Sequence, residues 1–291
     1  MSKFDLIYKE MVEDIINNGV WDKDQEVRTK WKDGTPAYTK SIVSKQIRLD
    51  NTEVPILTTK KVAWKTAIHE LIWFYIKRTS DVSYLRENNV KIWEEWTGNN
   101  NSIGKAYGYQ LGKRIDVDRG EKAEYYGSIV DVMTPTNQVD NLIHELKTNP
   151  SSRRHVISLW NIDDLRFMNL YPCVWHSQWL VKEGKLHLIV GVRSNDVALG
   201  NPFNIFQYYV LQRMISQVTG YEMGTLTFNI NDCHVYERHI DPLKEQISRT
   251  SYEAPELWIN PDIKNFDDFT IDDFKLINYK HHDKIPMEVA I

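Results

Sequence analysis

The sequence has little sulfur and no long apolar run. Its 291 residues include two cysteines, Cys173 and Cys233, which are too few for a disulfide framework. A reducing compartment is therefore the simpler interpretation. The most apolar window, residues 62–76, is interrupted by three charged or polar residues, and the first residues lack the apolar core of a secretion signal. These absences predict a cytoplasmic protein with no membrane partner.

The chain also lacks an excess of either charge. Its 36 basic and 40 acidic residues give a net charge of -4, so we expect no required nucleic-acid partner. There is no glycine-rich phosphate loop and no Cys-x-x-Cys or His-Glu-x-x-His pattern. Cys233, His234 and His239 are too few and wrongly spaced for zinc, so we expect no metal. A cysteine hydrolase with His234 as base stays open, although no local signature supports it.

No repeat, low-complexity tract or flexible linker divides the chain, which predicts a single domain over residues 1–291. Residues 112–138 are polar and irregular and are typical of a surface insertion. The hydrophobic pattern predicts helices over residues 4–18, 64–76, 139–150, 201–219 and 235–249. It predicts strands over residues 41–49, 155–160, 174–181, 185–193 and 225–231, with a hairpin turn at 182–185. Interspersed helices, strands and hairpins indicate an α+β fold with a large mixed, mostly antiparallel sheet.

Cys173 stands at the beginning of a predicted strand, directly after Pro172. One interpretation is a small buried core residue, the usual fate of a free cysteine. The other is a nucleophile, because the preceding proline fixes the backbone and nearby arginines favour the thiolate over the thiol. The spacing of the residues alone does not choose between them.

Three arginines stand in or beside the neighbouring strands. Arg153 and Arg154 precede a strand, and Arg193 ends another. They are either solvated side chains or an anion clamp, since a guanidinium matches a phosphate with two hydrogen bonds. Adjacent strand residues point to opposite faces, so Arg153 and Arg154 can share one anion only at an interface or on irregular backbone.

Glu70 lies on a predicted helix that is apolar nearly all round. A carboxylate in such surroundings is costly unless it is paired or wet. The two interpretations are a buried salt bridge, for example to an arginine, and a general acid or base at the edge of a cavity.

Residues 193–204, RSNDVALGNPFN, form the densest polar stretch, between a strand and a helix. Asn201 as N-cap and Pro202 in the first turn are explained by helix capping. Ser194, Asp196 and Asn204 are not required for the turn. The amide of Asn204 can read both a donor and an acceptor of a ligand.

The ordered motifs of nearly the whole chain resemble those of the thymidylate synthases. They are IHELIWF, IWEEW, KAYGYQ, NPSSRRHVISLWN, YPCVWHSQW, VRSNDVALGNPFNIFQY, NDCHVY and the final EVAI. The resemblance implies a sheet-to-sheet homodimer that converts dUMP to dTMP, with 5,10-methylenetetrahydrofolate donating carbon and hydride. The alternative is a dUMP hydroxymethylase, in which water captures the methylene instead of hydride. Trp93, which shields that step in the family, favours the methyl product.

The resemblance also implies roles for individual residues. Cys173 would attack C6 of the uracil, and Glu70 would move protons through water. Asp196 and Tyr107 would be further catalytic residues. The dUMP contacts would be Arg28, Arg153, Arg154, Arg193, Ser194, Asn195, Asp196, Asn204, His234 and Tyr236, with Arg153 and Arg154 supplied by the partner subunit. The folate contacts would be Ile92, Trp93, Trp96, Asp196, Leu199, Gly200, Phe203 and Ala290.

Four positions depart from the commonest pattern of that family. Val174 follows the cysteine where His is usual, and Val192 stands where Gln is usual. Ala63 occupies a position that often carries a basic or polar folate contact, and Leu111 stands where Trp is common. These residues indicate a divergent branch and affect the folate and phosphate contacts, whereas Cys173, Glu70 and Asn204 are unchanged.

Overall fold

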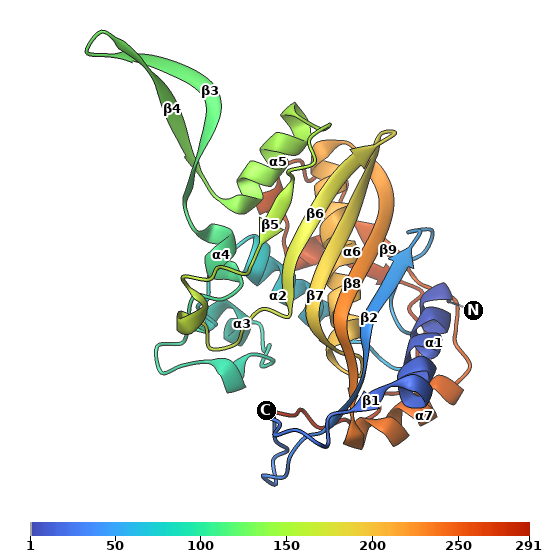
Figure 1. The fold of residues 1–291 in the computed structure, drawn as a ribbon. Helices are drawn as coiled ribbons and strands as arrows, with labels where there is room; N and C mark the ends of the chain where they lie inside the picture. The colour runs from blue at the N-terminus through green and yellow to red at the C-terminus, as the bar shows by residue number, and fades with distance from the viewer. Residues whose placement is uncertain (1) are drawn as a thin grey trace.

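The computed structural model describes residues 2–291, which form one domain around a six-stranded sheet (Figure 1). The strand order is β1-β2-β8-β7-β6-β5. The strands of this sheet are β1 (Val20–Trp21), β2 (Thr39–Leu49), β5 (Val156–Ser158), β6 (Val174–Lys182), β7 (Lys185–Asp196) and β8 (Glu222–Tyr236). Every neighbouring pair is antiparallel except β7 and β8, which run parallel. The predicted α+β fold with a mixed, mostly antiparallel sheet is confirmed.

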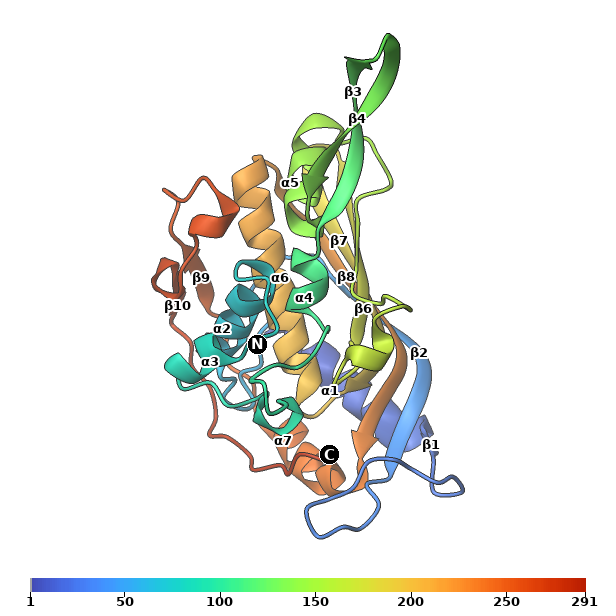
Figure 2. The ribbon, with the colours of Figure 1, turned by 90° about the vertical axis from the view of Figure 1, so that its left-hand side faces the viewer.

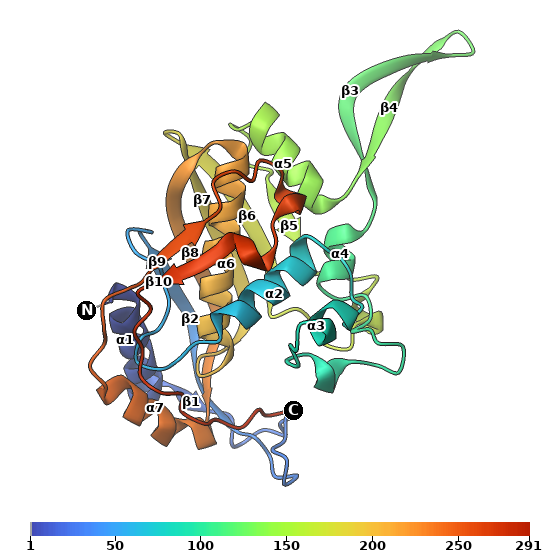
Figure 3. The same cartoon turned by 180° about the vertical axis from the view of Figure 1, so that it is seen from behind.

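Helices pack on one face of this sheet. They are α1 (Lys3–Asn18), α2 (Trp64–Tyr75), α3 (Ser83–Glu87), α4 (Gly108–Gly112), α5 (Gln138–Thr148), α6 (Gly200–Thr219) and α7 (Ile240–Ser248). Helix α6 lies directly against β7 and β8, and α2 crosses α6 on its far side (Figure 2). Fourteen of the twenty residues of α6 are buried, so this helix forms the centre of the core. Short strands β9 (Glu256–Ile259) and β10 (Phe274–Ile277) form a separate outer ribbon (Figure 3).

The opposite face of the sheet is more polar. Along β8, Leu226, Phe228 and Ile230 are buried, whereas Thr227 is half-buried and Asn229 is exposed. This alternation is that of a strand with one face on the core. The sheet therefore presents one broad face that no helix covers in the views of Figures 1 and 2.

Residues 112–138 contain a long hairpin that projects from the body of the domain (Figure 1). Strands β3 (Ile115–Tyr125) and β4 (Ser128–Thr136) pair antiparallel. The surface position is as expected, but the prediction of irregular structure is wrong. Tyr126 and Gly127 have φ values of 49° and 78°. Positive φ at both central residues makes the type of tight turn whose twist matches a hairpin.

The predicted helices and strands recur, with two corrections. Residues 235–236 belong to β8, and the last long helix begins only at Ile240, because pairing of residues 235–236 with β2 extends the strand. Helix α6 begins at Gly200, so Asn201 is not its N-cap but a fully buried residue in its first turn. Between residues 2 and 291, no helix is both long and apolar enough to cross a membrane.

Candidate active site

The parallel pairing of β7 and β8 gathers polar side chains at one end of the sheet. Ser194 pairs with Asp232 and Asp196 pairs with His234. Because parallel strands end at the same edge, both sets of side chains lie together. Helix α6 begins four residues after the end of β7, and the N-terminus of a helix favours anions.

Cys173 lies immediately before β6, and its backbone is fixed from two sides. Its N–H donates to Tyr107 Oη (3.0 Å), and its carbonyl accepts from the backbone N–H of Arg193 (2.8 Å). The Arg193 guanidinium donates to the carbonyls of Pro172 and Tyr171, both at 2.9 Å. The Pro172–Cys173 corner is therefore held by an arginine and a tyrosine.

The Cys173 thiol is more basic than the sequence suggested. Burial raises its pKa above the usual value, while the charge of Arg193 and the hydrogen bond to Tyr107 lower it. Arg193 lowers the pKa of Cys173 as expected, but the expected net lowering is wrong, because burial raises this pKa by more.

A cavity of about 60 Å³ lies in front of Cys173. Its lining residues are Glu70, Leu71, Phe74, Tyr75, Trp93, Tyr107, Leu111, Leu159, Cys173, Val174, Asn204, Gln207 and Tyr208. Room of this size holds several water molecules when polar groups are present to bind them. The structure thus brings Cys173, Glu70 and Asn204 from three distant parts of the chain to one space.

Glu70 on α2 is 8% exposed and is paired with neutral donors rather than with an arginine. Trp93 Nε1 and Gln207 Nε2 both donate to its carboxylate. Burial raises the pKa of Glu70, and these two hydrogen bonds lower it. Of the two interpretations, the cavity-edge acid or base fits the structure, and the buried salt bridge does not.

Tyr107 adopts a strained backbone, with φ 41° and ψ -100°. Its ring stacks on Phe74 at 4.6 Å between centroids and meets Trp93 edge-on at 5.2 Å. Burial raises the pKa of its hydroxyl well above the usual value. A non-glycine residue persists in such a conformation only where its surroundings hold it firmly, a situation common at functional sites.

Asp196 and Asn195 both have local structural partners. Asp196 Oδ1 accepts the N–H groups of Ala198 (2.9 Å) and Leu199 (3.2 Å), so the prediction that Asp196 is not needed for the turn is wrong. Asn195 Oδ1 accepts from Asn201 Nδ2 at 2.7 Å, with both side chains buried. The turn before α6 is therefore built by these side chains.

Only some of the residues predicted to bind the phosphate and the ribose lie close to one another in the structure. Arg28 is exposed on the loop between β1 and β2, close enough to Tyr236 for its charge to lower the pKa of that hydroxyl. Burial nonetheless raises the pKa of Tyr236 to about 12. The His234 and Tyr236 rings meet edge-on at 5.3 Å. Arg153 and Arg154 are exposed before β5 and do not line the cavity within the chain.

The predicted folate contacts form an aromatic group and a helix end. Trp93 is buried, and half-buried Trp96 meets it edge-on at 5.6 Å, next to Ile92. Half-buried Leu199, Gly200 and Phe203 stand at the beginning of α6, beside Asn204. Ala290 lies in the terminal segment, where Ile291 pairs with Lys30 through two backbone hydrogen bonds.

Sequence reasoning missed Gln207 and Lys60. Gln207 stands one helical turn after Asn204, so helical spacing could have placed it on the same face. Lys60 is 8% exposed and donates to the Ala198 carbonyl at 2.6 Å. Burial lowers its pKa to about 8, and the charge of Asp196 opposes that change. No local pattern marked this lysine.

Comparisons with known proteins agree with this geometry. A sequence model described as thymidylate synthase matches residues 6–291. The chain belongs to the thymidylate synthase family. It is 60% identical over 292 residues to a thymidylate synthase of Bacillus subtilis subsp. natto, and 59% identical to one of Bacillus phage phi3T. Both alignments cover 100% of each chain. The solved thermostable thymidylate synthase A of Bacillus subtilis gives a TM-score of 0.88 at 60% identity, covering 99% of both chains.

These family relatives also bear on the segment around the hairpin. Because the alignments cover both chains completely, residues 112–138 have a counterpart in the Bacillus and phage thymidylate synthases.

In the described part of the chain, no group of three or more His, Cys, Asp or Glu side chains is arranged to hold a metal ion.

Proposed function

We propose that the protein methylates dUMP to dTMP, using 5,10-methylenetetrahydrofolate as the donor of carbon and hydride. The observation that carries this proposal is the meeting of Cys173, Glu70 and Asn204 at one small cavity, in a chain 60% identical to thymidylate synthases. The whole chain acts as one such domain, and residues 112–138, which contain the hairpin, form a polar surface insertion within it.

Cys173 forms the covalent bond to the substrate. Its sulfur attacks C6 of the uracil, the C5–C6 double bond opens, and the electron pair moves toward C5 and the O4 carbonyl. Because burial raises the pKa of the thiol, the proton must leave as the ligand arrives. Arg193 and Tyr107, which lower that pKa, stabilise the thiolate at this moment.

Glu70 handles protons through water in the cavity. An ionised carboxylate can accept the proton that leaves C5, and a protonated one can donate to the enolate oxygen at C4. Burial raises the pKa of Glu70, and the hydrogen bonds from Gln207 and Trp93 lower it, so the surroundings favour the protonated form more than water does.

Asn204 recognises the uracil edge with one donor and one acceptor. His234 and Tyr236 bind the ribose, and Asn195 and Asp196 shape the turn beside it. Arg28, Arg193 and Ser194 bind the phosphate from within the subunit, and the partner's Arg153 and the partner's Arg154 complete that site.

The folate fits the aromatic group beside the cavity. Trp93 and Trp96 present a broad π-surface, and Leu199 and Phe203 add apolar area, which suits a flat ring system. When bound, this co-substrate supplies the one-carbon unit and the hydride that reduces it. Trp93 excludes water from the reacting carbon, and Ile92, Gly200 and Ala290 line the remaining side.

A homodimer joined through the open faces of the two sheets accounts for Arg153 and Arg154. Both are exposed at the sheet edge, away from the cavity of their own chain. The test mixes Arg153→Glu with Cys173→Ala subunits, each inactive alone. A heterodimer keeps one complete site, so random exchange should restore about a quarter of wild-type activity. No recovery once heterodimers have formed would rule out the shared site.

The activity itself is tested by incubating the protein with dUMP and methylenetetrahydrofolate. Mass analysis should identify dTMP, with one dihydrofolate formed for each nucleotide. The dUMP hydroxymethylase alternative is not favoured, because the relatives bear the name thymidylate synthase. A hydroxymethyl product with tetrahydrofolate left intact would reverse that preference. The cytoplasmic location and the absence of a nucleic-acid requirement stay predictions.

A further inference from the structure

Two chain segments form facing walls beside Cys173. Residues 103–113 carry Tyr107, and residues 161–172 lead directly to the thiol. Two backbone hydrogen bonds join these segments, from Lys105 N–H to the Phe167 carbonyl (2.8 Å) and from Asn169 N–H to the Ile103 carbonyl (3.1 Å). At Gly104, with φ 75°, a Cβ would lie 2.1 Å from the Phe167 oxygen, so only glycine permits this close approach.

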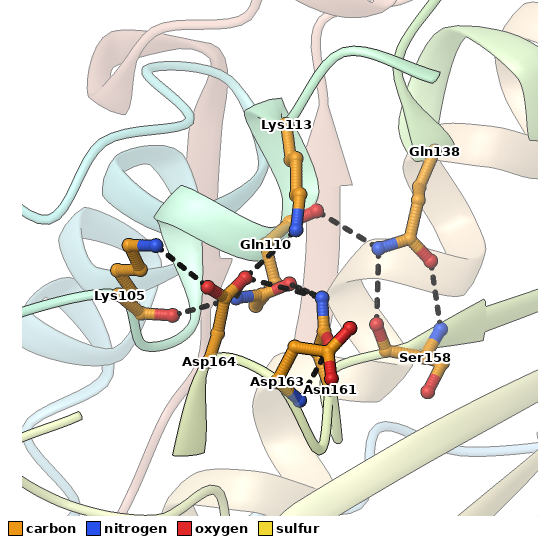
Figure 4. A network of polar contacts seen from close by, with 8 residues as sticks. All are labelled: Lys105, Gln110, Lys113, Gln138, Ser158, Asn161, Asp163 and Asp164. Atoms are coloured by element: carbon orange, nitrogen blue, oxygen red, sulfur yellow. Dashed lines mark hydrogen bonds and ion pairs between the residues drawn. The ribbon is translucent and has the colours of Figure 1, made fainter. Parts of the chain in front are cut away.

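Asp164 is the centre of a polar network between these walls (Figure 4). Its side chain is 5% exposed and accepts four hydrogen bonds. The donors are Lys105 Nζ (2.7 Å), Lys113 Nζ (2.8 Å), Gln110 Nε2 (3.1 Å) and Asn161 Nδ2 (3.1 Å). The hydrogen bonds from Lys105 and Lys113 hold the pKa of Asp164 well below its usual range.

Residues of this network lie on both sides of the strained Tyr107 in the sequence. Lys105 stands two residues before Tyr107, and Gln110 and Lys113 follow it on and after α4. Gln110 is fixed from its other side as well, because its backbone carbonyl accepts from Gln138 Nε2 at 2.8 Å. Anchors on both sides of a residue with φ 41° supply the constraint that such backbone requires.

We infer that Asp164 is a positioning residue that sets the distance between Tyr107 and Cys173 by clamping these two walls together. The inference rests on the proposed function, since it assigns Asp164 a role in aligning the proposed nucleophile. Asp164 does not line the cavity, so it acts through Tyr107 and the Pro172–Cys173 corner rather than on substrate.

If Asp164 clamps the two segments together, removing its negative charge should lower kcat more than it changes KM for dUMP. In Asp164→Asn the carboxylate is lost while the shape of the side chain is kept. We expect kcat to fall roughly tenfold, because small misplacements of a nucleophile are costly, while KM for dUMP stays within about twofold. Asp164→Glu, which keeps the charge, should recover much of kcat. Asp14→Asn, which breaks a remote ion pair with Lys45, is the matched control and should leave both constants unchanged.

Alkylation of Cys173 by iodoacetamide gives a readout that does not need catalysis. Loosening the clamp should speed alkylation several-fold, with the fully buried Cys233 as an internal reference. Lys105→Met and Lys113→Met remove one donor each from partly exposed positions, so they test the clamp even where Asp164→Asn does not fold.

The possible outcomes distinguish failure of the Asp164 clamp from failure of the proposed function. Unchanged kcat and alkylation rate in folded Asp164→Asn, or in both lysine variants where it does not fold, would overturn the clamp. A parallel loss of kcat and of folded protein, with an unchanged alkylation rate in the folded fraction, would also overturn it. Wild-type protein that makes no dTMP would instead refute the proposed function, and the alkylation rates would still test the clamp.

Discussion

The hydrogen bonds that Glu70 accepts can be tested separately through Gln207. Gln207→Met removes the Nε2 amide group, which donates to Glu70 and to the backbone carbonyl of Ala67 (3.0 Å), and keeps an unbranched side chain of similar length. Burial raises the pKa of Glu70, and the bonds from Gln207 and Trp93 oppose that rise. Losing one bond therefore raises the pKa further. On the acidic side of the pH–activity profile, a smaller fraction of Glu70 is therefore ionised in Gln207→Met than in the wild type at each pH.

The size of the effect follows from the surroundings of the carboxylate. A hydrogen bond to a charged acceptor contributes about 1.5–3 kcal/mol. The cavity beside Glu70 can hold water, which replaces part of the lost bond, so the lower figure applies. About 1.5 kcal/mol corresponds to roughly a tenfold loss of ionised Glu70 on that limb. Activity should recover at higher pH, where Glu70 is ionised in both proteins.

The assay is the pH dependence of kcat/KM for tritium release from dUMP labelled at C5. Gln217→Met is the control, because Gln217 lies on the same helix and also donates to backbone carbonyls, those of Asn260 and Ile263 at 2.9 Å. We expect a pH-dependent loss in Gln207→Met alone. An equal loss at every pH, or the same profile in both variants, would refute the assignment of Glu70 as the titrating group.

Three further variants test other parts of the structure. Cys173→Ser should abolish tritium release while the thermal unfolding midpoint stays close to that of the wild type; full turnover would exclude the covalent step. Asn204→Asp should lower the preference for dUMP over dCMP by about 10²-fold or more in kcat/KM, because a carboxylate has no donor for the uracil carbonyl. Gly191→Ala places a Cβ about 2.0 Å from the His176 ring and should cost about 1–3 kcal/mol in urea unfolding. The double variant with His176→Ala should recover most of it, and no recovery would show that another contact is responsible.

The sequence predicted the sheet and the main helices because these depend on local periodicity. The alternation of apolar and polar residues over 41–49 and the nearly continuous apolar surface of residues 64–76 are visible without tertiary contacts. Strand β8 was predicted too short, because residues 232–234 pair with both β2 and β7 and residues 235–236 pair with β2. The hairpin over residues 112–138 was missed because its turn, Tyr126-Gly127, carries only one glycine as a signal.

The candidate site was predicted largely through resemblance, and its supporting contacts were not predicted. Glu70 was recognised as a carboxylate on an apolar helix, but its partner Gln207 is 137 residues away and no spacing rule joins them. The clamp around Asp164 depends likewise on contacts between distant segments. The pKa of Cys173 was expected to fall because charge is visible in a sequence, whereas burial, which raises it, is not.

The unusual Val174 is explained by its neighbours rather than by Cys173 itself. Val174 is 3% exposed and pairs across β6 and β7 with Val192, another departure from the family pattern. It also lines the cavity together with Leu111, a third departure. A polar ring at position 174 would lie beside Val192, its partner on the same face of the sheet, and would exchange hydrogen bonds to bulk water for contact with that apolar side chain. Val174 and Val192 therefore form one apolar pair across β6 and β7, and we expect these two residues to be exchangeable only together. Val174→His alone should destabilise the fold by about 1–3 kcal/mol in urea unfolding. An unchanged midpoint would mean that this position accommodates a polar side chain and that the departures at Val174 and Val192 are independent.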